Sequence, residues 1–434
     1  MRDKFLKELS SIVDNKDSSF LLAVSGGVDS MVLLHLFKNA SLNFSVAHCN
    51  FLLRGRDSDN DELFVQSICE KSRTKFFVKK FETKKTASEN TISIQMAARD
   101  LRYEWFYDLA NKNKFDYIVT AHHFHDSIET ILFNISRGTG ISGLKGISKK
   151  QNRTIRPLLN FTKNDIVDFA KKNKIEFRED VSNNDEKYKR NKIRKSIIPD
   201  FQSLNSGFIE SMQTTLKNFQ SAEKIYLHFI ENEKKRCTTC SDGILKIDIS
   251  LLRNSIEPKT VLFEIIKEYG FFDIDSIFKV IDAESGKTFY SKNHFLIKDR
   301  NDICISKLIK NRNTEISKAN NYIEDPIKLS LELVDKFKLA EDKNKSVACL
   351  NYDKLQFPLT LRNWKEGDWF IPLGMKGKKK LSDYFVDNKF SLIEKKRCFV
   401  LCSNNDIVWI VGHRIDERYK FVDGEEKAYI CRIK

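Results

Sequence analysis

The sequence predicts an α/β protein with a Rossmann-like parallel sheet at its N-terminus, followed by an α-rich middle module and a small mixed α/β C-terminal domain. Two observations predict the parallel sheet. Short apolar strands alternate with helical patterns over residues 1–205, and polar loops follow several of those strands. Loops at the carboxyl ends of parallel strands meet at one edge of a sheet, where ligands bind. We therefore expect the functional site at that edge.

The elements of the N-terminal part follow from the spacing of its apolar residues. Short uninterrupted apolar runs predict buried strands, and apolar positions three and four apart predict helices. The strands expected on this basis cover residues 20–24, 44–48, 75–80 and 117–120. The helices expected between and after them cover residues 31–37, 58–72, 89–113 and 126–137. This alternation is typical of βαβ units, which build parallel sheets.

The pattern changes at Gly207, which is interpreted as a break between domains. Beyond it we expect a strand at 244–249, a hairpin ending near Ser306, and helices over residues 208–230, 256–268 and 273–283. Residues 307–345 are polar and rich in Lys and Asn, so a linker is expected there. The sequence therefore predicts three domains, which cover residues 1–205, 206–345 and 346–434.

Composition and charge exclude several classes of protein. The 434 residues contain no apolar run near the ~18 residues that span a bilayer, and the charged N-terminus lacks the apolar core of a signal peptide. Nine irregularly spaced cysteines favour free thiols over a disulfide framework, and the single CxxC motif, Cys237 to Cys240, has no second motif to pair with. We therefore expect a cytoplasmic protein without membrane contact. The 75 Lys and Arg outnumber the 60 Asp and Glu, and a net charge of +15 favours polyanionic partners.

The loop between the first strand and the first helix has the properties of a phosphate site. It consists of Ser25, Gly26, Gly27, Val28, Asp29 and Ser30. Glycine permits close backbone approach, and the helix that follows directs free N–H groups at an anion. The two serines add hydroxyl groups, and Ser30 is also a candidate to cap the helix. No Gly-Lys-Ser/Thr follows, so this is not a Walker A loop.

Asp29 is the unusual member of this loop, because a carboxylate beside a phosphate is costly unless a cation accompanies it. A Mg²⁺ ion that bridges phosphate and carboxylate would explain its presence. The alternative is a strand–helix turn that merely uses glycine. The six residues together, between a buried strand and a helix, favour the phosphate site.

Residues Ser25–Ser30, with the sequence SGGVDS, resemble the signature loop of the N-type ATP pyrophosphatases, the PP-loop superfamily. That superfamily cleaves ATP between the α and β phosphates and adenylates a carbonyl oxygen. A longer ordered set of segments is similar to the tRNA(Ile)-lysidine synthetase family. These segments are residues 50–59, 97–106, 120–130, 137–140, 156–159, 179–185, 190–194, 362–368, 372–381, 407–412 and 414–418. This resemblance covers most of the chain and is weakest over residues 235–350.

The second resemblance implies a tRNA-modifying ligase. In that family, ATP adenylates the wobble cytidine of the isoleucine tRNA that has a CAU anticodon, and Mg²⁺ is the expected cofactor. Free L-lysine then displaces AMP through its ε-amine and forms lysidine, which changes codon recognition from AUG to AUA. The resemblance therefore implies ATP, tRNA(Ile) and lysine as ligands, and it leaves a homodimer open.

Five residues are expected to perform this reaction. Asp29 and Asp126 are candidates for Mg²⁺ binding or charge positioning, and His123 is the preferred polar contact and a candidate to relay a proton from the attacking lysine. The alternative for His123 is a capping or structural histidine. Arg99 and Arg102 lie three apart on one expected helix, where either arginine could stabilise charge on the α-phosphate. A solvated helix face is the alternative for both arginines.

The loop after the fourth strand departs from the pattern of the family. His125 and Ser127 stand where the family usually has an acid and a Gln, and Asp126 is kept. A metal site here would therefore be built differently. His122 is expected to be structural. Zinc bound by the three histidines of this loop is disfavoured, because no cysteine or fourth ligand falls at a suitable spacing.

Basic residues in two parts of the chain are expected to contact tRNA. Lysine and arginine mixed with Asn, Ser and Gly suit phosphate contacts better than base reading. The residues assigned on this basis are Arg190, Arg194, Lys195, Arg362, Lys376, Lys378, Lys379, Lys380 and Arg397. The usual alternative for such runs is a solvated face.

Two rival functions are weighed against the ligase. A PP-loop tRNA 2-thiolation enzyme would use the same ATP loop, but it needs paired cysteines, and the N-terminal part offers Cys49 and Cys69 alone. A non-enzymatic RNA-binding protein with a decayed nucleotide loop conflicts with the intact residues Ser25–Ser30 and Asp126.

Overall fold

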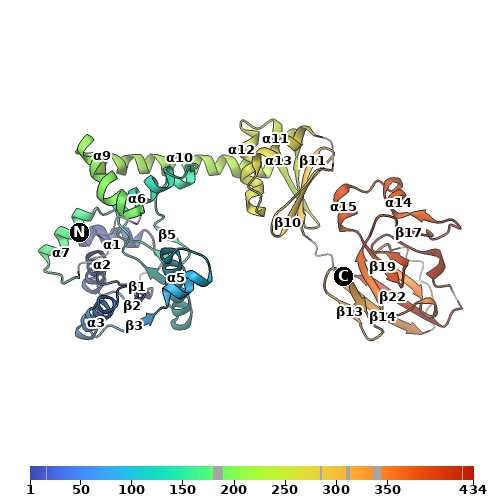
Figure 1. The fold of residues 1–434 in the computed structure, drawn as a ribbon, viewed down its shortest axis with the longest axis horizontal. Coiled ribbons are helices and arrows are strands. Elements are labelled where there is room, and N and C mark those ends of the chain that lie inside the picture. The colour runs from blue at the N-terminus through green and yellow to red at the C-terminus, as the bar shows by residue number, and fades with distance from the viewer. Residues whose placement is uncertain (16, 179–188, 284–285, 309–312, 336–343, 423) are drawn as a thin grey trace. The chain divides into compact units, whose positions relative to one another are not determined.

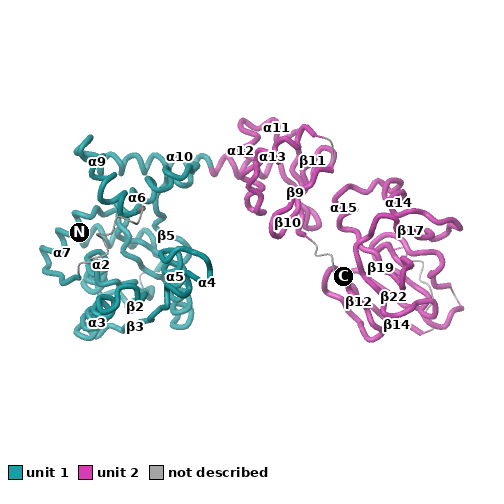
Figure 2. Tube along the Cα trace, in the orientation of Figure 1, with its two compact units in different colours: residues 1–226 teal, residues 227–434 magenta. Residues whose placement is uncertain are grey.

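The computed structural model describes residues 1–15, 17–178, 189–283, 286–308, 313–335, 344–422 and 424–434. The chain forms two compact units, residues 1–226 and residues 227–434 (Figures 1 and 2). Among the described residues, no helix is both long enough and apolar enough to cross a membrane.

A six-stranded sheet forms the centre of the first unit (Figure 1). Its strand order is β3-β2-β1-β4-β6-β5. The neighbours from β3 to β6 are parallel, whereas the β5–β6 pair at one edge is antiparallel. The expected parallel sheet is therefore confirmed. Its strands are β1 (Phe20–Ala23), β2 (Phe44–Asn50), β3 (Phe76–Lys80), β4 (Tyr117–Val119), β5 (Lys150–Gln151) and β6 (Thr154–Ile155).

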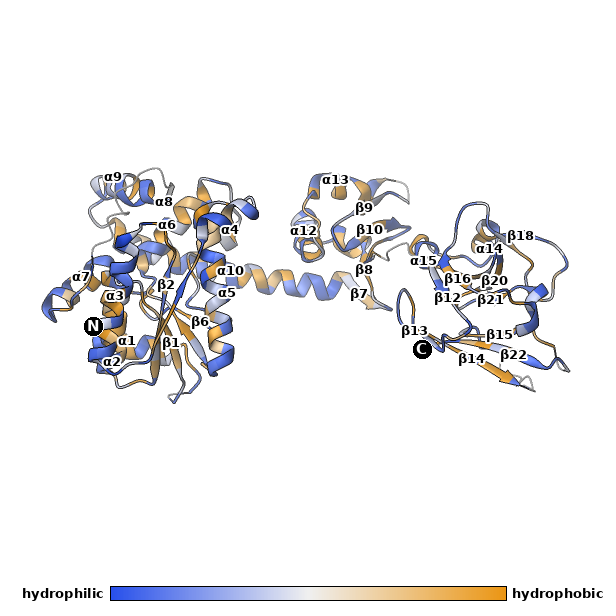
Figure 3. Ribbon diagram, turned by 60° about the horizontal axis from the view of Figure 1, so that its bottom comes forward, coloured by the Kyte–Doolittle hydropathy of each residue, from blue (hydrophilic) through white to orange (hydrophobic). Residues whose placement is uncertain are grey.

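Helices cover both faces of this sheet. Phe20 pairs with Phe44 and Tyr117 across β1, so β1 lies in the middle of the sheet. Because side chains alternate along a strand, Phe20 packs towards α1 and α2, whereas Leu21 packs towards α5. In Figure 3, β1 is coloured as hydrophobic, as a strand buried on both faces requires. The helices are α1 (Arg2–Ser10), α2 (Val28–Asn39), α3 (Arg56–Lys71), α4 (Thr83–Glu89), α5 (Ile94–Asn113), α6 (Phe124–Ile135) and α7 (Lys163–Lys172).

Two expected helices differ from those in the structure. α2 begins at Val28 rather than near residue 31, so the last three residues of the SGGVDS loop form its first turn. The helix expected over residues 89–113 is α5, which begins at Ile94, and the short helix α4 before it, which ends at Glu89, was not expected. The hydroxyl of Ser93 accepts a hydrogen bond from the N–H of Met96 at 3.2 Å and caps α5, which explains the new start.

Further helices support α6 from outside the sheet. They are α8 (Lys189–Lys192), a π-helical turn at Ile193–Ile197, α9 (Ile198–Leu204) and α10 (Phe208–Cys237). Phe124 and Ile128 of α6 share one apolar cluster with Ile193, Ile198 and Phe208. This packing stabilises the position of α6, whose first turn carries site residues.

The second unit begins with an antiparallel sheet of order β7-β8-β11-β10-β9. Its strands are β7 (Thr238–Ser241), β8 (Ile244–Asp248), β9 (Thr288–Tyr290), β10 (His294–Asp299) and β11 (Asp302–Lys307). The helices beside it are α11 (Ile249–Arg253), α12 (Pro258–Ile266) and α13 (Ile274–Phe278). The α-rich middle module is therefore wrong. Its helices are short, and its core depends on the strands.

The rest of the second unit contains two further antiparallel sheets. One has the order β12-β16-β19-β20-β21, and the other β13-β14-β22-β15. Trp409 and Leu331 belong to one apolar cluster that joins the two sheets. The strands are β12 (Thr314–Ile316), β13 (Tyr322–Ile323), β14 (Leu329–Asp335), β15 (Val347–Asn351), β16 (Leu359–Asn363), β19 (Phe399–Ser403), β20 (Asp406–Ile410), β21 (Arg414–Ile415) and β22 (Lys427–Ile433).

A small β-ribbon and two helices complete this unit. The ribbon pairs β17 (Trp369–Phe370) with β18 (Lys379–Lys380), and the helices are α14 (Leu381–Asp387) and α15 (Leu392–Arg397). The linker expected over 307–345 is also wrong where the structure describes it. β12 pairs with β16, and β14 pairs with β22, so these strands belong to the C-terminal sheets.

Candidate active site

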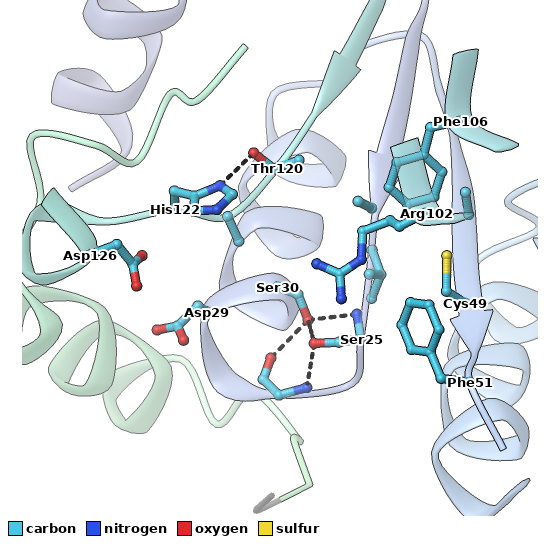
Figure 4. Close-up of a pocket in the computed structure, with 15 residues that line it drawn as sticks. Ser25, Asp29, Ser30, Cys49, Phe51, Arg102, Phe106, Thr120, His122 and Asp126 are labelled. Atoms are coloured by element: carbon cyan, nitrogen blue, oxygen red, sulfur yellow. Dashed lines mark hydrogen bonds between the residues drawn. The ribbon is translucent and has the colours of Figure 1, made fainter. Parts of the chain in front are cut away.

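The SGGVDS loop lies at the carboxyl end of β1, as a ligand site on a parallel sheet requires (Figure 4). Gly26 has a φ of +95°, a conformation that only glycine adopts without strain. The hydroxyl of Ser30 accepts hydrogen bonds from the N–H groups of Ser25 and Gly26, both at 3.2 Å, and donates to the carbonyl of Gly27 at 2.9 Å. Ser30 therefore holds the loop closed. The suggestion that Ser30 caps α2 is wrong, because Gly27 is the N-cap residue.

A cavity of about 350 Å³ opens beside this loop (Figure 4). Polar groups of the loop and of α6 line one side, and Figure 4 shows Asp29 and Asp126 facing each other there. The other side is an apolar wall that includes Phe51 and Phe106. The cavity therefore offers a charged end for phosphates and an apolar end for a flat ring.

A second cavity of about 400 Å³ shares part of this wall. The residues common to both cavities are Ser25, Cys49, Phe51 and Arg102. Polar side chains dominate the remainder, namely His48, Asn50, Arg54, Ser58, Asp61, Gln95 and Asn191. Two ligands with a common boundary at Arg102 would fit this arrangement.

The two arginines expected on one helix differ in position. Arg102 lines both cavities, and its guanidinium lies 5.2 Å from the centre of the Phe51 ring. Arg99 is exposed, and its guanidinium lies 5.1 Å from the centre of the Tyr103 ring. The structure thus brings Arg102 into the site and gives Arg99 an outer position on the same helix.

His123 lies between two carboxylates. Its Nε2 is 3.7 Å from Oδ1 of Asp29, and its Nδ1 is 3.7 Å from Oδ2 of Asp126. The side chain is buried, and among the described residues Nδ1 has no hydrogen-bond partner. The backbone N–H of His123 donates to Asp126 at 2.8 Å, which holds the carboxylate at the start of α6. An imidazole placed in this way can exchange a proton with either side.

The surroundings of Asp126 favour its charged form. Burial raises the pKa of this carboxyl, but the nearby His123 and His122, the N–H of His123 and Arg194 outweigh burial, so the pKa is lowered overall. His122 itself accepts or donates one bond with Thr120 at 2.8 Å. Burial, together with nearby arginines, lowers the pKa of His122 to about 4, so it is neutral near pH 7.

Glu129, which is buried, forms an ion pair with the partly exposed Arg194, and the sequence did not indicate the role of this pair. The guanidinium of Arg194 donates to both carboxylate oxygens of Glu129, at 2.6 and 3.0 Å. It also lies 3.7 Å from Asp126. Burial raises the pKa of Glu129 despite this pairing. One signal was present, because Glu129 follows Asp126 by three positions and therefore shares its helix face.

Lys163 is a second site residue that sequence reasoning missed. Its ammonium contacts both carboxylate oxygens of Asp29, at 2.6 and 2.8 Å. The two residues are 134 positions apart, so no local pattern could reveal the pair. The backbone N–H of Lys163 donates to Nδ1 of His125 at 3.2 Å. Burial and the nearby His123 lower the pKa of His125 to about 4, which keeps this nitrogen an acceptor.

Ser127 has a structural role. Its side chain is fully buried, and its hydroxyl accepts a hydrogen bond from the N–H of Ile147 at 3.3 Å. Gly146 packs closely beside it, since a Cβ built on Gly146 would lie 3.0 Å from that of Ser127. A small residue therefore suits this position.

The protein alone offers few metal ligands here. Within the described ranges, no group of three or more His, Cys, Asp and Glu side chains could hold a metal ion. Mg²⁺ commonly binds one or two carboxylates together with substrate phosphates and water. Asp29 and Asp126 fit that pattern, because both line the cavity beside the phosphate loop. A magnesium ion would therefore enter with its nucleotide.

The residues expected to contact tRNA have different environments. Arg190 is exposed on α8, and Lys195 lies in the π-helical turn, whereas Arg194 is paired with Glu129. Residues 179–185, which belong to the motif set, lie outside the described residues. No position of a tRNA follows from these contacts, so their assignment to tRNA stays a prediction.

In the second unit, three of the predicted tRNA-binding residues have protein partners. Arg362 forms a bidentate ion pair with Asp368, at 2.8 and 2.9 Å. Arg397 donates a hydrogen bond to the carbonyl of Asp242 at 2.7 Å. Lys379 forms an ion pair with Asp387. Lys376, Lys378 and Lys380 are exposed. The ammonium of Lys378 lies 3.9 Å from the centre of the Trp369 ring, on a flexible cation–π contact that a phosphate could replace.

Fold and loop together define an ATP-using PP-loop enzyme. Residues 1–201 match the PP-loop domain family, residues 240–309 match the TilS substrate binding domain, and residues 359–431 match the TilS substrate C-terminal domain. The chain is 39% identical to tRNA(Ile)-lysidine synthase of Parabacteroides distasonis and 37% identical to that of Bacteroides thetaiotaomicron, over 96% of each chain in both cases. A relative in Clostridium tetani is 32% identical over 94% of this chain and 92% of its own.

The chain therefore belongs to the tRNA(Ile)-lysidine synthase family. It is an ATP-dependent PP-loop ligase that modifies tRNA, as the motif set predicted.

Proposed function

We propose that this site first adenylates the 2-carbonyl oxygen of the anticodon wobble cytidine and then admits free L-lysine. In the first step the cytosine oxygen attacks the α-phosphorus, and pyrophosphate leaves with the bonding electrons. In the second step the lysine ε-amine attacks C2, the C2–O bond breaks, and AMP leaves with the oxygen while the amine loses a proton. The observation that carries the proposal is His123 between Asp29 and Asp126, beside the phosphate loop.

The first cavity suits ATP. Its charged end lies beside the N-terminus of α2, whose first N–H groups have no intrahelical acceptor. Its apolar wall, with Phe51 and Phe106, suits the adenine ring. Mg²⁺ bound to the phosphates and to Asp29 or Asp126 would neutralise charge on the leaving pyrophosphate.

The second cavity suits the cytosine. The Nδ1–H of His48 donates to the carbonyl of Val24 at 2.9 Å, so Nε2 is left as an acceptor on a side chain that lines the cavity. Burial lowers the pKa of His48, which favours this neutral form. The 4-amino group of cytosine donates hydrogen bonds, whereas uracil has a carbonyl there. Arg102, shared by both cavities, would stabilise charge on the α-phosphate.

The charged side chains near the start of α6 suit the lysine substrate. A free amino acid carries an ammonium and a carboxylate on one carbon, so its site needs both signs of charge. Asp126 and Glu129 supply negative charge, and Arg194 supplies positive charge within 3.7 Å of both. His123 adjoins the same acid and would take the proton that the ε-amine loses.

The distal parts of the chain would bind tRNA. Residues 240–309 and 359–431 match the substrate domains of the family, and Lys376, Lys378 and Lys380 are exposed on the second unit. We accordingly keep the division into a catalytic part over 1–205 and RNA-binding parts over 206–345 and 346–434, with strands of 314–335 assigned to the last part.

Sulfur transfer is disfavoured by the cysteines of the first unit. Cys49 lines both cavities, but burial raises the pKa of its thiol to about 12. Cys69 packs in the apolar cluster on the α1 and α2 face of the sheet, and burial raises its pKa to about 11. Neither thiol is a thiolate near pH 7, and only one of them lines the site.

Incorporation of radiolabelled lysine into tRNA(Ile) with a CAU anticodon tests the proposal. We expect labelling that requires ATP and Mg²⁺ and that is accompanied by AMP. The same tRNA with uridine at the wobble position is the matched control and should stay unlabelled. AMP formation that depends on tRNA without lysine incorporation would contradict lysine as the nucleophile.

A further inference from the structure

We propose that Lys163 is a catalytic residue for the departure of pyrophosphate, and that His125 is the positioning residue that directs Lys163 to the phosphate loop. The inference deepens the proposed function and rests on its adenylation step. It starts from two contacts that the mechanism above does not use. Lys163 binds both oxygens of Asp29, and His125 accepts the backbone N–H of Lys163.

Asp29 needs a cation before ATP arrives. Its carboxylate is in the first turn of α2, beside the loop that would receive the triphosphate. An unpaired carboxylate at that place would repel a polyanion. Lys163 supplies the missing charge at 2.6 and 2.8 Å, while its side chain stays about one-third exposed. The pair therefore keeps the loop close to neutral and still leaves the ammonium free to move.

Binding of MgATP would change the partner of Lys163. Asp29 would be a ligand of Mg²⁺, and the ammonium of Lys163 would then be released beside the bound phosphates. A lysine side chain has a flexible four-carbon stem, so a small rotation brings the ammonium to an oxygen of the β or γ phosphate. Negative charge grows on that group as the bond between the α-phosphorus and the bridging oxygen breaks. A cation held there lowers the barrier.

The backbone of Lys163 is held at a fixed place. It is the first residue of α7, and the side chain of Thr162 and that of Asp165 cap this helix reciprocally, at 3.1 and 2.8 Å. Two hydrogen bonds connect this helix start to the start of α6. The N–H of Phe124 donates to the carbonyl of Phe161 at 2.9 Å, and the N–H of Lys163 donates to His125 at 3.2 Å.

The hydrogen bond from the N–H of Lys163 to Nδ1 of His125 gives a physical reason for a histidine at position 125. The ring nitrogen that accepts from Lys163 requires a neutral side chain with its acceptor at the Nδ1 position. The same helix start that carries Lys163 is thereby connected to the turn that carries His123 and Asp126. His125 thus couples the cation for the leaving group to the acid–base residues, without touching substrate.

The first test replaces Lys163. We expect Lys163→Met to slow single-turnover, tRNA-dependent AMP formation about 100-fold or more, with less than about a fivefold change in the KM for MgATP. Lys163→Arg keeps the charge and should recover to within about tenfold of the native rate. Lys171→Met, on the last turn of the same helix and exposed, is the matched control and should behave as the native enzyme.

A leaving-group comparison separates chemistry from structure. Two ATP analogues are used, one with a β,γ-difluoromethylene bridge and one with a β,γ-methylene bridge, which leaves less readily. Lys163→Met should lose more rate with the methylene analogue than with the difluoromethylene analogue. An equal loss with both, or a rate within about threefold of native, would overturn the role of Lys163.

The positioning role of His125 is tested by two variants, one that keeps a hydrogen-bond acceptor at this position and one that removes it. His125→Asn places a carbonyl oxygen where Nδ1 lies, and His125→Leu removes the acceptor. We expect the Leu variant to lower kcat for AMP formation about tenfold at nearly constant KM, and the Asn variant to recover most of it. Equal rates in both variants would contradict the positioning role. If the native enzyme itself forms no AMP with tRNA, the proposed function fails instead.

Discussion

The candidate active site of the first unit and residues 376–380 of the second unit, here called the lysine loop, use basic residues in opposite ways. Lys163 and Arg194 each contact a carboxylate at 2.6 Å, so their positions are set by protein partners. Lys376, Lys378 and Lys380 are exposed, and the ammonium of Lys378 lies 3.9 Å from the centre of the Trp369 ring. Cations paired with acids beside the phosphate loop are placed next to the reacting centre before substrate binds. Exposed lysines suit a phosphate backbone, whose contacts tolerate many positions.

The largest expected effect comes from Asp29, which lies within contact distance of both Lys163 and His123. Asp29→Ala should lower AMP formation by about 1000-fold, since it removes the partner of Lys163 and the carboxylate proposed to hold Mg²⁺. Affinity for tRNA should change less than about twofold, because the residues proposed to bind tRNA lie elsewhere. Single-turnover assays and filter binding measure the two quantities. Loss of tRNA binding in this variant would contradict the division of labour between the two regions.

The next effect comes from Glu129, whose buried carboxylate holds Arg194. Glu129→Gln should raise the KM for lysine about 10- to 100-fold, because it removes one negative charge of the proposed lysine site and weakens the hold on Arg194, which keeps only the 3.7 Å contact with Asp126 among the described ion pairs. AMP formation without lysine should stay within about threefold of native. Glu104→Gln, exposed on α5, is the control. An unchanged KM for lysine would show that this ion pair is purely structural.

A smaller effect is expected in the lysine loop. Replacing Lys378, Lys379 and Lys380 with Gln should weaken tRNA binding about tenfold and reduce the slope of log affinity against log salt by about 2. Lys379 contributes less than its neighbours if its pair with Asp387 persists. Lys427→Gln on β22 is an exposed control. An unchanged salt slope in the triple variant would remove this loop from the tRNA interface.

The smallest effect concerns stability against pH. Burial lowers the pKa of His122 to about 4, whereas an unfolded histidine titrates near ~6.5. Between these values the unfolded chain binds a proton that the native protein does not, so stability is complete above about pH 6.5 and falls towards pH 4. His122→Asn should make that fall in melting temperature shallower, by roughly 2–4 °C. A calorimetric pH series in which both proteins change equally would exclude His122 as a source.

Much of this site could be predicted from sequence, because its signals are local. The phosphate loop, Asp126, His123 and Arg102 all lie in short sequence motifs, residues 25–30, 97–106 and 120–130, that resemble those of the family. Lys163 could not be found in this way, because its partner Asp29 lies 134 positions earlier in the chain. Ser30 was considered as a cap of the helix, but its hydroxyl accepts hydrogen bonds from the N–H groups of Ser25 and Gly26 inside the loop.

The fold shows the same limit. The parallel sheet was predicted from β1 to β4, which contain short apolar runs that alternate with helices. The two-residue strands β5 and β6 were not predicted, because Lys150–Gln151 and Thr154–Ile155 are too short to form a pattern. In the middle module, the strand expected at 244–249 is β8, and the hairpin expected to end near Ser306 is the β10–β11 pair. The edge strand β7 was not predicted, because Thr238–Ser241 is a polar run. Strands β12 to β14 lie in polar sequence, and their pairing partners are far along the chain, so no local pattern marked them.

The central claim is that the cytosine oxygen is transferred to AMP, and isotope transfer tests it most directly. The substrate is tRNA(Ile) with ¹⁸O at the 2-carbonyl of its wobble cytidine, and AMP is analysed by mass spectrometry after one turnover with lysine. We expect one ¹⁸O atom in the phosphate of AMP for each lysidine formed. AMP without ¹⁸O, accompanied by lysidine, would contradict adenylation at this oxygen and the mechanism built on it.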